Sequence, residues 1–99
     1  MRYEIAKSGS AVVLKLIGEV VAADKGEFGS VIDKTIAEGG AVIVDMGQLS
    51  FMDSAGLGFL LNLWQKTKDS GVSVTISGAS GEVKELLELS DFQILFNFE

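Results

Sequence analysis

Residues 42–58 read VIVDMGQLSFMDSAGLG, and this stretch decides the fold of the chain. It opens within the apolar run Ala41–Val44, passes through a short polar turn, and reaches Asp53 and Ser54, where an amphipathic helix begins. The first N–H groups of a helix lack intrahelical partners and carry the positive end of the helix dipole, so they would stabilise an oxygen or a phosphate on Ser54. Ser54 is therefore a candidate switch residue. The alternative is that Asp53 or Ser54 only caps the helix, which contributes about 1 kcal/mol.

The first seventeen residues predict a β-hairpin. Tyr3 and Ile5 form a brief alternating pair, and a Ser-Gly-Ser turn follows at residues 8–10. The run Ala11–Ile17 is apolar except for Lys15. We therefore expect two strands that enter a sheet together.

Residues 24–38 predict a helix that precedes a central strand. Apolar residues recur there at spacings of three and four, and the pair Gly39-Gly40 favours a left-handed helix end. The run Ala41–Val44 is apolar on consecutive positions, as in a central strand covered on both faces. Such a strand would be reached from a parallel neighbour by a right-handed crossover through the helix.

The helix that follows Ser54 carries more apolar residues than one face can hold. At 100° per residue, four of them fall on the side expected to face the core: Leu57, Leu60, Leu61 and Trp64. Leu63 lies on the flank. Phe59 points almost opposite to Leu57, toward solvent, and it is a candidate contact with a partner because aromatic residues dominate interface centres. The alternative is a ring that lies flat on the surface.

The rest of the chain continues the alternation of strands and helices. Val72, Val74 and Ile76 alternate with polar residues as in a half-exposed strand, and Ser80 is placed to cap a short helix. The aromatic-rich end, residues 92–98, predicts a last strand or a docked tail over the core. No linker or internal repeat divides the sequence, so we expect a single α/β domain over residues 1–99.

Composition excludes several classes of function. The chain has 99 residues, no cysteine and no histidine, so the commonest general base and metal ligand are missing, and we expect no enzyme, metal site or cofactor. The formal net charge of −6 opposes direct binding to nucleic acid. No segment approaches the roughly 20 apolar residues of a membrane span, and the N-terminus lacks the apolar run of a signal peptide. We therefore expect a cytoplasmic protein without membrane insertion.

The central motif resembles the signature of a known family. Ile43-Val-Asp45, followed by LSFMDSAGLG at residues 49–58, resembles the STAS family, most closely its bacterial anti-sigma factor antagonists. Residues 16–20 are similar to the early strand and turn of that family, and residues 77–87 to its late strand and helix. The resemblance implies an α/β fold with a mixed β-sheet and helices packed mainly on one side.

The resemblance also implies a function. An unphosphorylated antagonist binds an anti-sigma factor that is also a serine kinase and so releases a sigma factor; in this chain the switch would be phosphorylation of Ser54. We expect a monomer or weak dimer. The expected partner-binding residues surround that serine: Asp53, Ser54, Ala55, Gly56, Gly58, Phe59 and Asn62. Gly56 and Gly58 remove side chains from the first turn, which would let a partner come close.

The sequence departs from the pattern of the family at one position. Many members carry an aspartate near the phosphorylated serine, where this chain has Val21, and Asp24 follows three residues later. A rival hypothesis is therefore an accessory subunit of an ABC-type lipid transport system, in which the serine need not be phosphorylated. A small enzyme is disfavoured because no base and nucleophile pair is evident.

Overall fold

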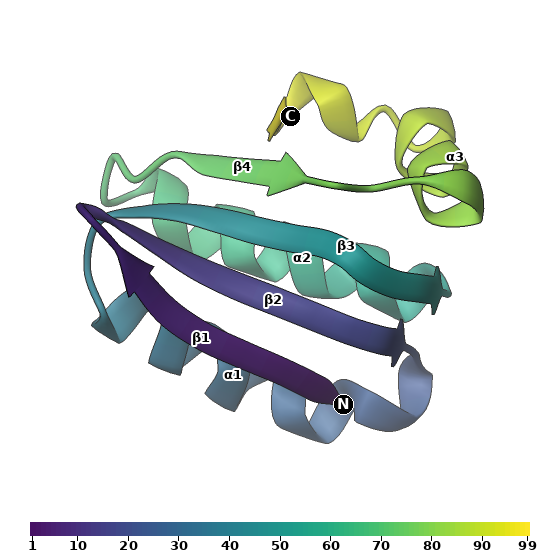
Figure 1. Ribbon diagram of the computed structural model, residues 1–99, viewed down its shortest axis with the longest axis horizontal. Coiled ribbons are helices and arrows are strands. Elements are labelled where there is room, and N and C mark those ends of the chain that lie inside the picture. The colour runs from purple at the N-terminus through teal and green to yellow at the C-terminus, as the bar shows by residue number, and fades with distance from the viewer.

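A five-stranded mixed β-sheet forms the centre of the molecule in the computed structural model, which describes residues 1–99 (Figure 1). The strands are β1 (Arg2–Ser8), β2 (Ala11–Val20), β3 (Ala41–Met52), β4 (Val74–Ser77) and β5 (Asn97–Phe98). They lie in the order β1-β2-β3-β4-β5, so neighbours in sequence are neighbours in the sheet. β3 is the central strand, as the sequence predicted.

Only the first two strands are antiparallel. They form the predicted hairpin, paired from Arg2 opposite Ile17 to Ser8 opposite Ala11, and the turn between them has Gly9 at a φ of +63°. The pairs β2 with β3, β3 with β4 and β4 with β5 are all parallel. Each parallel pair is joined through a helix, as parallel strands require.

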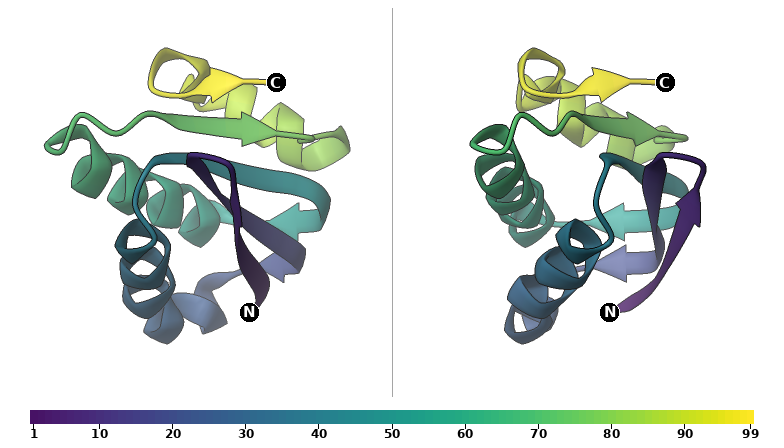
Figure 2. Two further views of the ribbon diagram at one scale, coloured as in Figure 1. Left: turned by 60° about the vertical axis from the view of Figure 1, so that its left-hand side comes forward. Right: turned by 90° about the vertical axis from the view of Figure 1, so that its left-hand side faces the viewer.

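Three α-helices make these connections, with two short 3-10 turns. The helical segments are η1 (Ala22–Asp24), α1 (Lys25–Ala37), α2 (Ser54–Lys68), α3 (Gly81–Leu89) and η2 (Phe92–Ile94). α1 and α2 lie on one face of the sheet, whereas α3 lies near the end of β4 (Figures 1 and 2). The predicted mixed sheet with helices mainly on one side is confirmed. None of the helices combines the length and the apolar character needed to cross a membrane.

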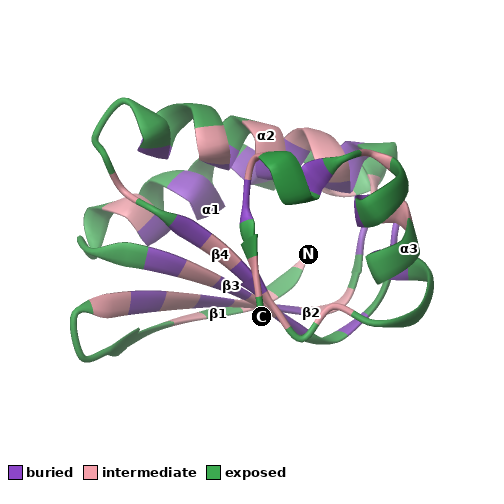
Figure 3. Cartoon of the chain, turned by 90° about the horizontal axis from the view of Figure 1, so that it is seen from above, coloured by how far each residue is buried: buried purple, intermediate pink, exposed green.

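The central strand differs from the prediction in two respects. β3 continues to Met52, directly before Asp53, so the segment expected to be a polar turn is extended strand. Val42, Val44 and Met46 are buried under the helices, but the alternate residues, such as Ile43, are only half-buried (Figure 3). The prediction that this strand is covered on both faces is therefore wrong. No helix packs on the second face of the sheet (Figure 2).

The orientation of α2 also differs from the prediction. Its buried residues are Ala55, Gly56, Phe59, Leu60, Leu63 and Thr67. Phe59 and Leu63 are both 0% exposed, whereas Leu57, Leu61 and Trp64 are only half-buried at the edge of the core. The buried face is the predicted one displaced by one residue, which is about 100° around the helix.

Two contacts explain this rotation. The ring of Phe59 meets the ring of Phe28 on α1 edge to face, with 5.1 Å between their centroids and 68° between their planes. Gly56 packs on the end of β3, where a Cβ atom would lie 2.9 Å from the Cβ and Sδ of Met52. Both partners belong to other elements. The helical periodicity of α2 itself holds no information about them.

The end of the chain forms a small cover beside β4. Phe92 and Phe96 are buried with their ring centroids 5.6 Å apart, and β5 pairs with β4. Ile94, by contrast, is 76% exposed. The segment was expected to be a last strand or a docked tail, and it contains both: β5 is a short last strand, and Phe92 and Phe96 dock on the core.

Candidate functional site

The start of α2 is fixed by Asp53. Its backbone is extended, with φ −102° and ψ −168°, and its Oδ1 accepts a hydrogen bond from the N–H of Ala55 at 2.8 Å. Asp53 is therefore the N-cap, and Ser54 is the first residue of the helix. The hydroxyl of Ser54 is exposed and makes no hydrogen bond within the protein. Of the two capping assignments that the sequence left open, the structure selects Asp53.

Asp53 also joins two elements. Its Oδ2 accepts a hydrogen bond from the N–H of Ala22, at 3.1 Å, and its own N–H donates to the carbonyl of Val20 at 3.3 Å. The end of β2 and the start of η1 are thereby held against the start of α2. Because both carboxylate oxygens are occupied, Asp53 acts as a structural link beside Ser54.

A groove runs between the beginnings of α1 and α2. It is open to solvent and has a volume of about 370 Å³, at the lower end of the range for small-molecule pockets. Its lining comes from both helices: Lys25, Phe28 and Gly29 on α1, and Ser54, Ala55, Gly58 and Asn62 on α2. Ser54 therefore lies in a hollow rather than on a flat surface.

Four of the seven predicted partner-binding residues line this groove: Ser54, Ala55, Gly58 and Asn62. A Cβ atom on Gly58 would meet nothing within 4 Å, so this glycine does leave open space. Gly56 and Phe59 are buried beneath the helix, so the predictions that they face a partner are wrong. The absent side chain of Gly56 makes room for Met52 of this chain, not for another protein.

Sequence reasoning missed the contribution of α1. Lys25, Phe28 and Gly29 are 25 to 29 residues before Ser54 in the chain, and no motif connects them to it. The helical periodicity predicted for residues 24–38 was correct, and Phe28 lies on the buried face of this helix. That periodicity did not show that the same turn of α1 borders the start of α2. The parallel crossover brings the two helix beginnings to the same end of the sheet.

Asp24 does not line the groove and makes two contacts of its own. Its Oδ2 accepts a hydrogen bond from the N–H of Val21 at 2.9 Å, and its Oδ1 lies 3.1 Å from the α-amino group of Met1. The Val21 hydrogen bond, followed by that of the amino group, holds the pKa of Asp24 below its usual value. Both oxygens of Asp24 are thus engaged by groups other than Ser54.

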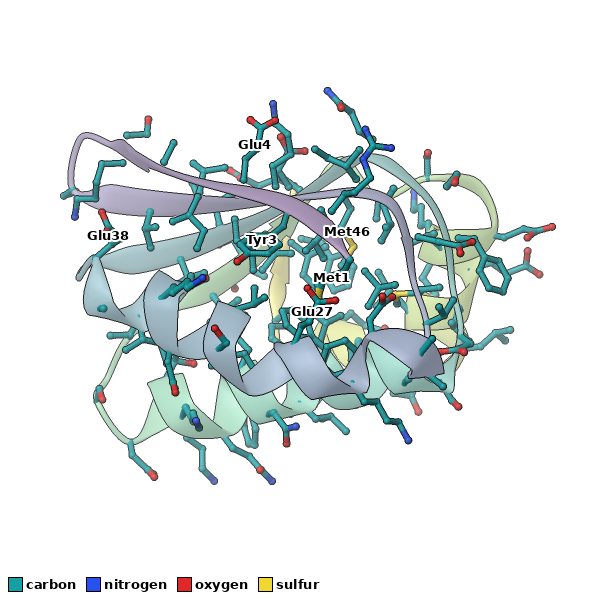
Figure 4. The ribbon with its side chains drawn as sticks, turned by 90° about the horizontal axis from the view of Figure 1, so that it is seen from below. Met1, Tyr3, Glu4, Glu27, Glu38 and Met46 are labelled. Atoms are coloured by element: carbon teal, nitrogen blue, oxygen red, sulfur yellow. The ribbon has the colours of Figure 1, made fainter.

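The α-amino group of Met1 is bound by two acidic residues. It donates to Glu27 Oε2 at 2.7 Å and pairs with Asp24, and Figure 4 shows Met1 and Glu27 close together. These two hydrogen bonds, that of Glu27 first, raise the pKa of the amino group above its usual value. The arrangement fastens the start of β1 to η1 and α1.

No other cluster suggests chemistry. The chain has no group of three or more His, Cys, Asp or Glu side chains arranged to hold a metal ion. No base is paired with Ser54, whose hydroxyl makes no hydrogen bond.

The whole chain matches one protein family. A family model described as the STAS domain covers residues 2–99, and the chain belongs to that family. A relative from Pseudomonas aeruginosa strain UCBPP-PA14, described as STAS-domain containing protein PA14_20770, is 32% identical over 54 residues. That match covers 54% of this chain and 54% of the relative, so it spans about half the length of each.

Solved structures share the fold at low sequence identity. The unphosphorylated anti-sigma factor antagonist SpoIIAA superposes with a TM-score of 0.75 at 20% identity, covering 99% of this chain and 87% of the other. The protein tm1081 of Thermotoga maritima, a candidate anti-sigma factor antagonist, gives 0.85 at 14% identity over 97% and 84% of the chains. A sulfate transporter family protein of Wolinella succinogenes gives 0.75 at 18% identity over 94% and 80%. These likenesses show the fold.

Proposed function

We propose that this chain is an anti-sigma factor antagonist whose groove between α1 and α2 binds an anti-sigma factor that is also a serine kinase. Binding of the unmodified protein would release a sigma factor, and phosphorylation of Ser54 would reverse it. The observation that carries this proposal is the exposed Ser54 hydroxyl, which begins α2 inside a groove and is not needed as a cap. Membership of the STAS family and the shared fold of SpoIIAA support it.

The physical basis of the switch is charge and hydration. A phosphoserine carries about −1.5 to −2 charges at neutral pH, and this protein already has a formal net charge of −6. The phosphate would place a strongly hydrated group in the groove that the partner has to enter. The cost of desolvation and the electrostatic repulsion would weaken binding, although the positive end of the α2 dipole favours the phosphate.

The kinase would have to supply most of the chemistry. Ser54 Oγ forms a bond to the γ-phosphorus of ATP, the bond between the β- and γ-phosphates breaks, and ADP leaves. The hydroxyl proton goes to a base on the kinase, because Val21 has no carboxylate and both oxygens of Asp24 are occupied. The role of this chain is to present the hydroxyl in a defined position at the start of α2.

The test is incubation with the candidate kinase and ATP, followed by intact mass and a pull-down. Ser54→Ala should abolish phosphate incorporation and retain the partner, with little change in stability because the hydroxyl makes no hydrogen bond. Ser50→Ala is the matched control: Ser50 is also exposed, but its hydroxyl donates to the carbonyl of Gly18 at 2.8 Å. Phosphate on Ser50 in place of Ser54 would contradict the assignment.

A charge mimic separates binding from folding. Ser54→Asp adds a negative charge at the N-terminus of α2, where the dipole favours it, so stability should be equal or slightly higher. Affinity for the anti-sigma factor should fall. Equal affinity of Ser54→Asp and Ser54→Asn in titration calorimetry would show that charge at this position does not control binding.

The rival function is an accessory subunit of an ABC-type lipid transporter. The STAS fold of a sulfate transporter family protein shows that this fold is not confined to antagonists, and Val21 agrees with a serine that is not phosphorylated. Neighbouring genes for a permease and an ATPase, together with co-purification of that ATPase in place of a serine kinase, would favour the rival.

A further inference from the structure

Lys25 is the only charged residue among the seven that line the groove. It is the first residue of α1 and is exposed, and its ammonium group enters no ion pair or hydrogen bond. Ser54 is the first residue of α2, and its hydroxyl is equally free. A free cation and a free hydroxyl thus face one hollow from two different helices.

The acidic groups close to this hollow are already occupied. The oxygens of Asp24 are used by the Val21 N–H and the amino group of Met1, and Glu27 is used by the same amino group. Both oxygens of Asp53 accept backbone N–H groups. No ion pair joins a carboxylate to Lys25, so its ammonium group is available to a phosphate on Ser54.

We propose that Lys25 forms, with the start of α2, an intramolecular binding site for the phosphoryl group of modified Ser54. This inference rests on the proposed function only in requiring that Ser54 is the modified residue. The ammonium group pairs with the phosphate oxygens across the groove, while the helix dipole of α2 favours the same negative charge. The lysine side chain is long and makes no other ion pair, and it lines the same hollow as Ser54.

This pairing adds a second element to the switch. In the unmodified protein Lys25 is available to an acidic group of a partner. In the phosphorylated protein the Lys25 side chain and the phosphate together occupy the groove. The phosphate of the same chain then neutralises the charge of Lys25. Phosphorylation then both fills the site and removes the positive charge that would attract the partner.

The test is ³¹P NMR titration of protein with phosphoserine installed at position 54 during synthesis, so that no kinase is required. The second pKa of a phosphoserine is about 6, and a nearby cation lowers it because it favours the dianion. Replacing Lys25→Gln should raise this pKa by roughly 0.2 to 0.7, the range expected for a solvent-exposed pair. The difference should shrink at high salt.

Two further variants isolate the pair from general charge effects. Lys84→Gln makes the same change in net charge on α3, outside the groove, and should leave the phosphate pKa close to that of the parent. Lys25→Arg should keep the low pKa. An equal pKa in Lys25→Gln and Lys84→Gln would overturn the proposal. Because the phosphate is installed synthetically, failure of any kinase to modify Ser54 would contradict the proposed function without affecting this measurement.

Discussion

Replacing Phe59 by alanine should destabilise the protein far more than replacing Trp64 by alanine. Phe59 is 0% exposed and lies between α2 and α1, with its ring edge to face on Phe28 at 5.1 Å. Trp64 is the larger side chain, but it is half-buried at the edge of the core, with Lys68 Nζ 4.6 Å from its ring centroid. The comparison therefore tests how α2 is rotated.

The magnitudes follow from burial. Truncation of a fully buried phenylalanine costs about 3–5 kcal/mol, because apolar contacts are lost and a cavity remains. Part of that cost is the aromatic pair, about 0.5–1.5 kcal/mol. For Trp64 we expect about 1–2 kcal/mol, since solvent already reaches the ring and the cation contact is exposed. In a domain of 99 residues the loss at Phe59 corresponds to a fall in melting temperature of more than about 10 °C.

The assay is urea unfolding followed by far-UV circular dichroism. Fluorescence is unsuitable because Trp64 is the single tryptophan of the chain. Leu63→Ala serves as a second buried position on the same face and should also cost more than Trp64→Ala. If Trp64→Ala proved the more destabilising change and Phe59→Ala were nearly neutral, the buried face described for α2 would be wrong.

Three further predictions concern the start of α2 and its surroundings. Gly56→Ala should destabilise, because its methyl group would lie 2.9 Å from Met52 atoms, whereas Gly58→Ala should stabilise by up to about 1 kcal/mol, since the space is open and alanine favours helix; thermal unfolding of both variants checks this pair. Asp53→Ala should cost about 1–2 kcal/mol in urea unfolding and Asp53→Asn less, because asparagine keeps a capping oxygen. The pKa of the Asp24 carboxylate is lowered in the folded state, so its contribution to the stability of the fold is present above its ordinary pKa, near 3.9, and is lost as pH falls through the lower folded value. The difference in stability between the parent and Asp24→Asn should therefore shrink between about pH 5 and pH 2, and a constant difference over that range would contradict the assignment.

Local patterns in the sequence were sufficient for the order and class of the elements. The hairpin at β1 and β2, the helical stripe of α1 and the crossover to β3 follow from periodicity and from glycines at the turns, including Gly39 at a φ of +78°. Local capping chemistry also limits the start of α2 to Asp53 or Ser54 as the cap, of which the structure has Asp53. Each of these signals depends on residues that are close together in the chain, so the sequence alone is sufficient to recognise it.

The rotation of α2 depended on tertiary structure. Its apolar residues extend around more than one face, so periodicity alone allowed two orientations, and contacts with Met52 and Phe28 selected the one that buries Phe59. As a direct result, Phe59 is buried and does not belong to the surface on which the sequence placed it. The prediction that β3 is covered on both faces was wrong for a similar reason. An apolar run cannot show whether a second layer of helices exists to cover the strand.

The sequence by itself determined that a helix begins at Asp53 or Ser54, after a central strand in a small acidic α/β domain. Only the tertiary structure decided what surrounds that serine. Asp53 acts as the cap and the link to Ala22, Asp24 is engaged by its own neighbours, and Lys25 lines the same groove from another helix. The physical reason is range: capping and periodicity act along a few consecutive residues, whereas a groove is made by elements that the sheet brings together from distant parts of the chain.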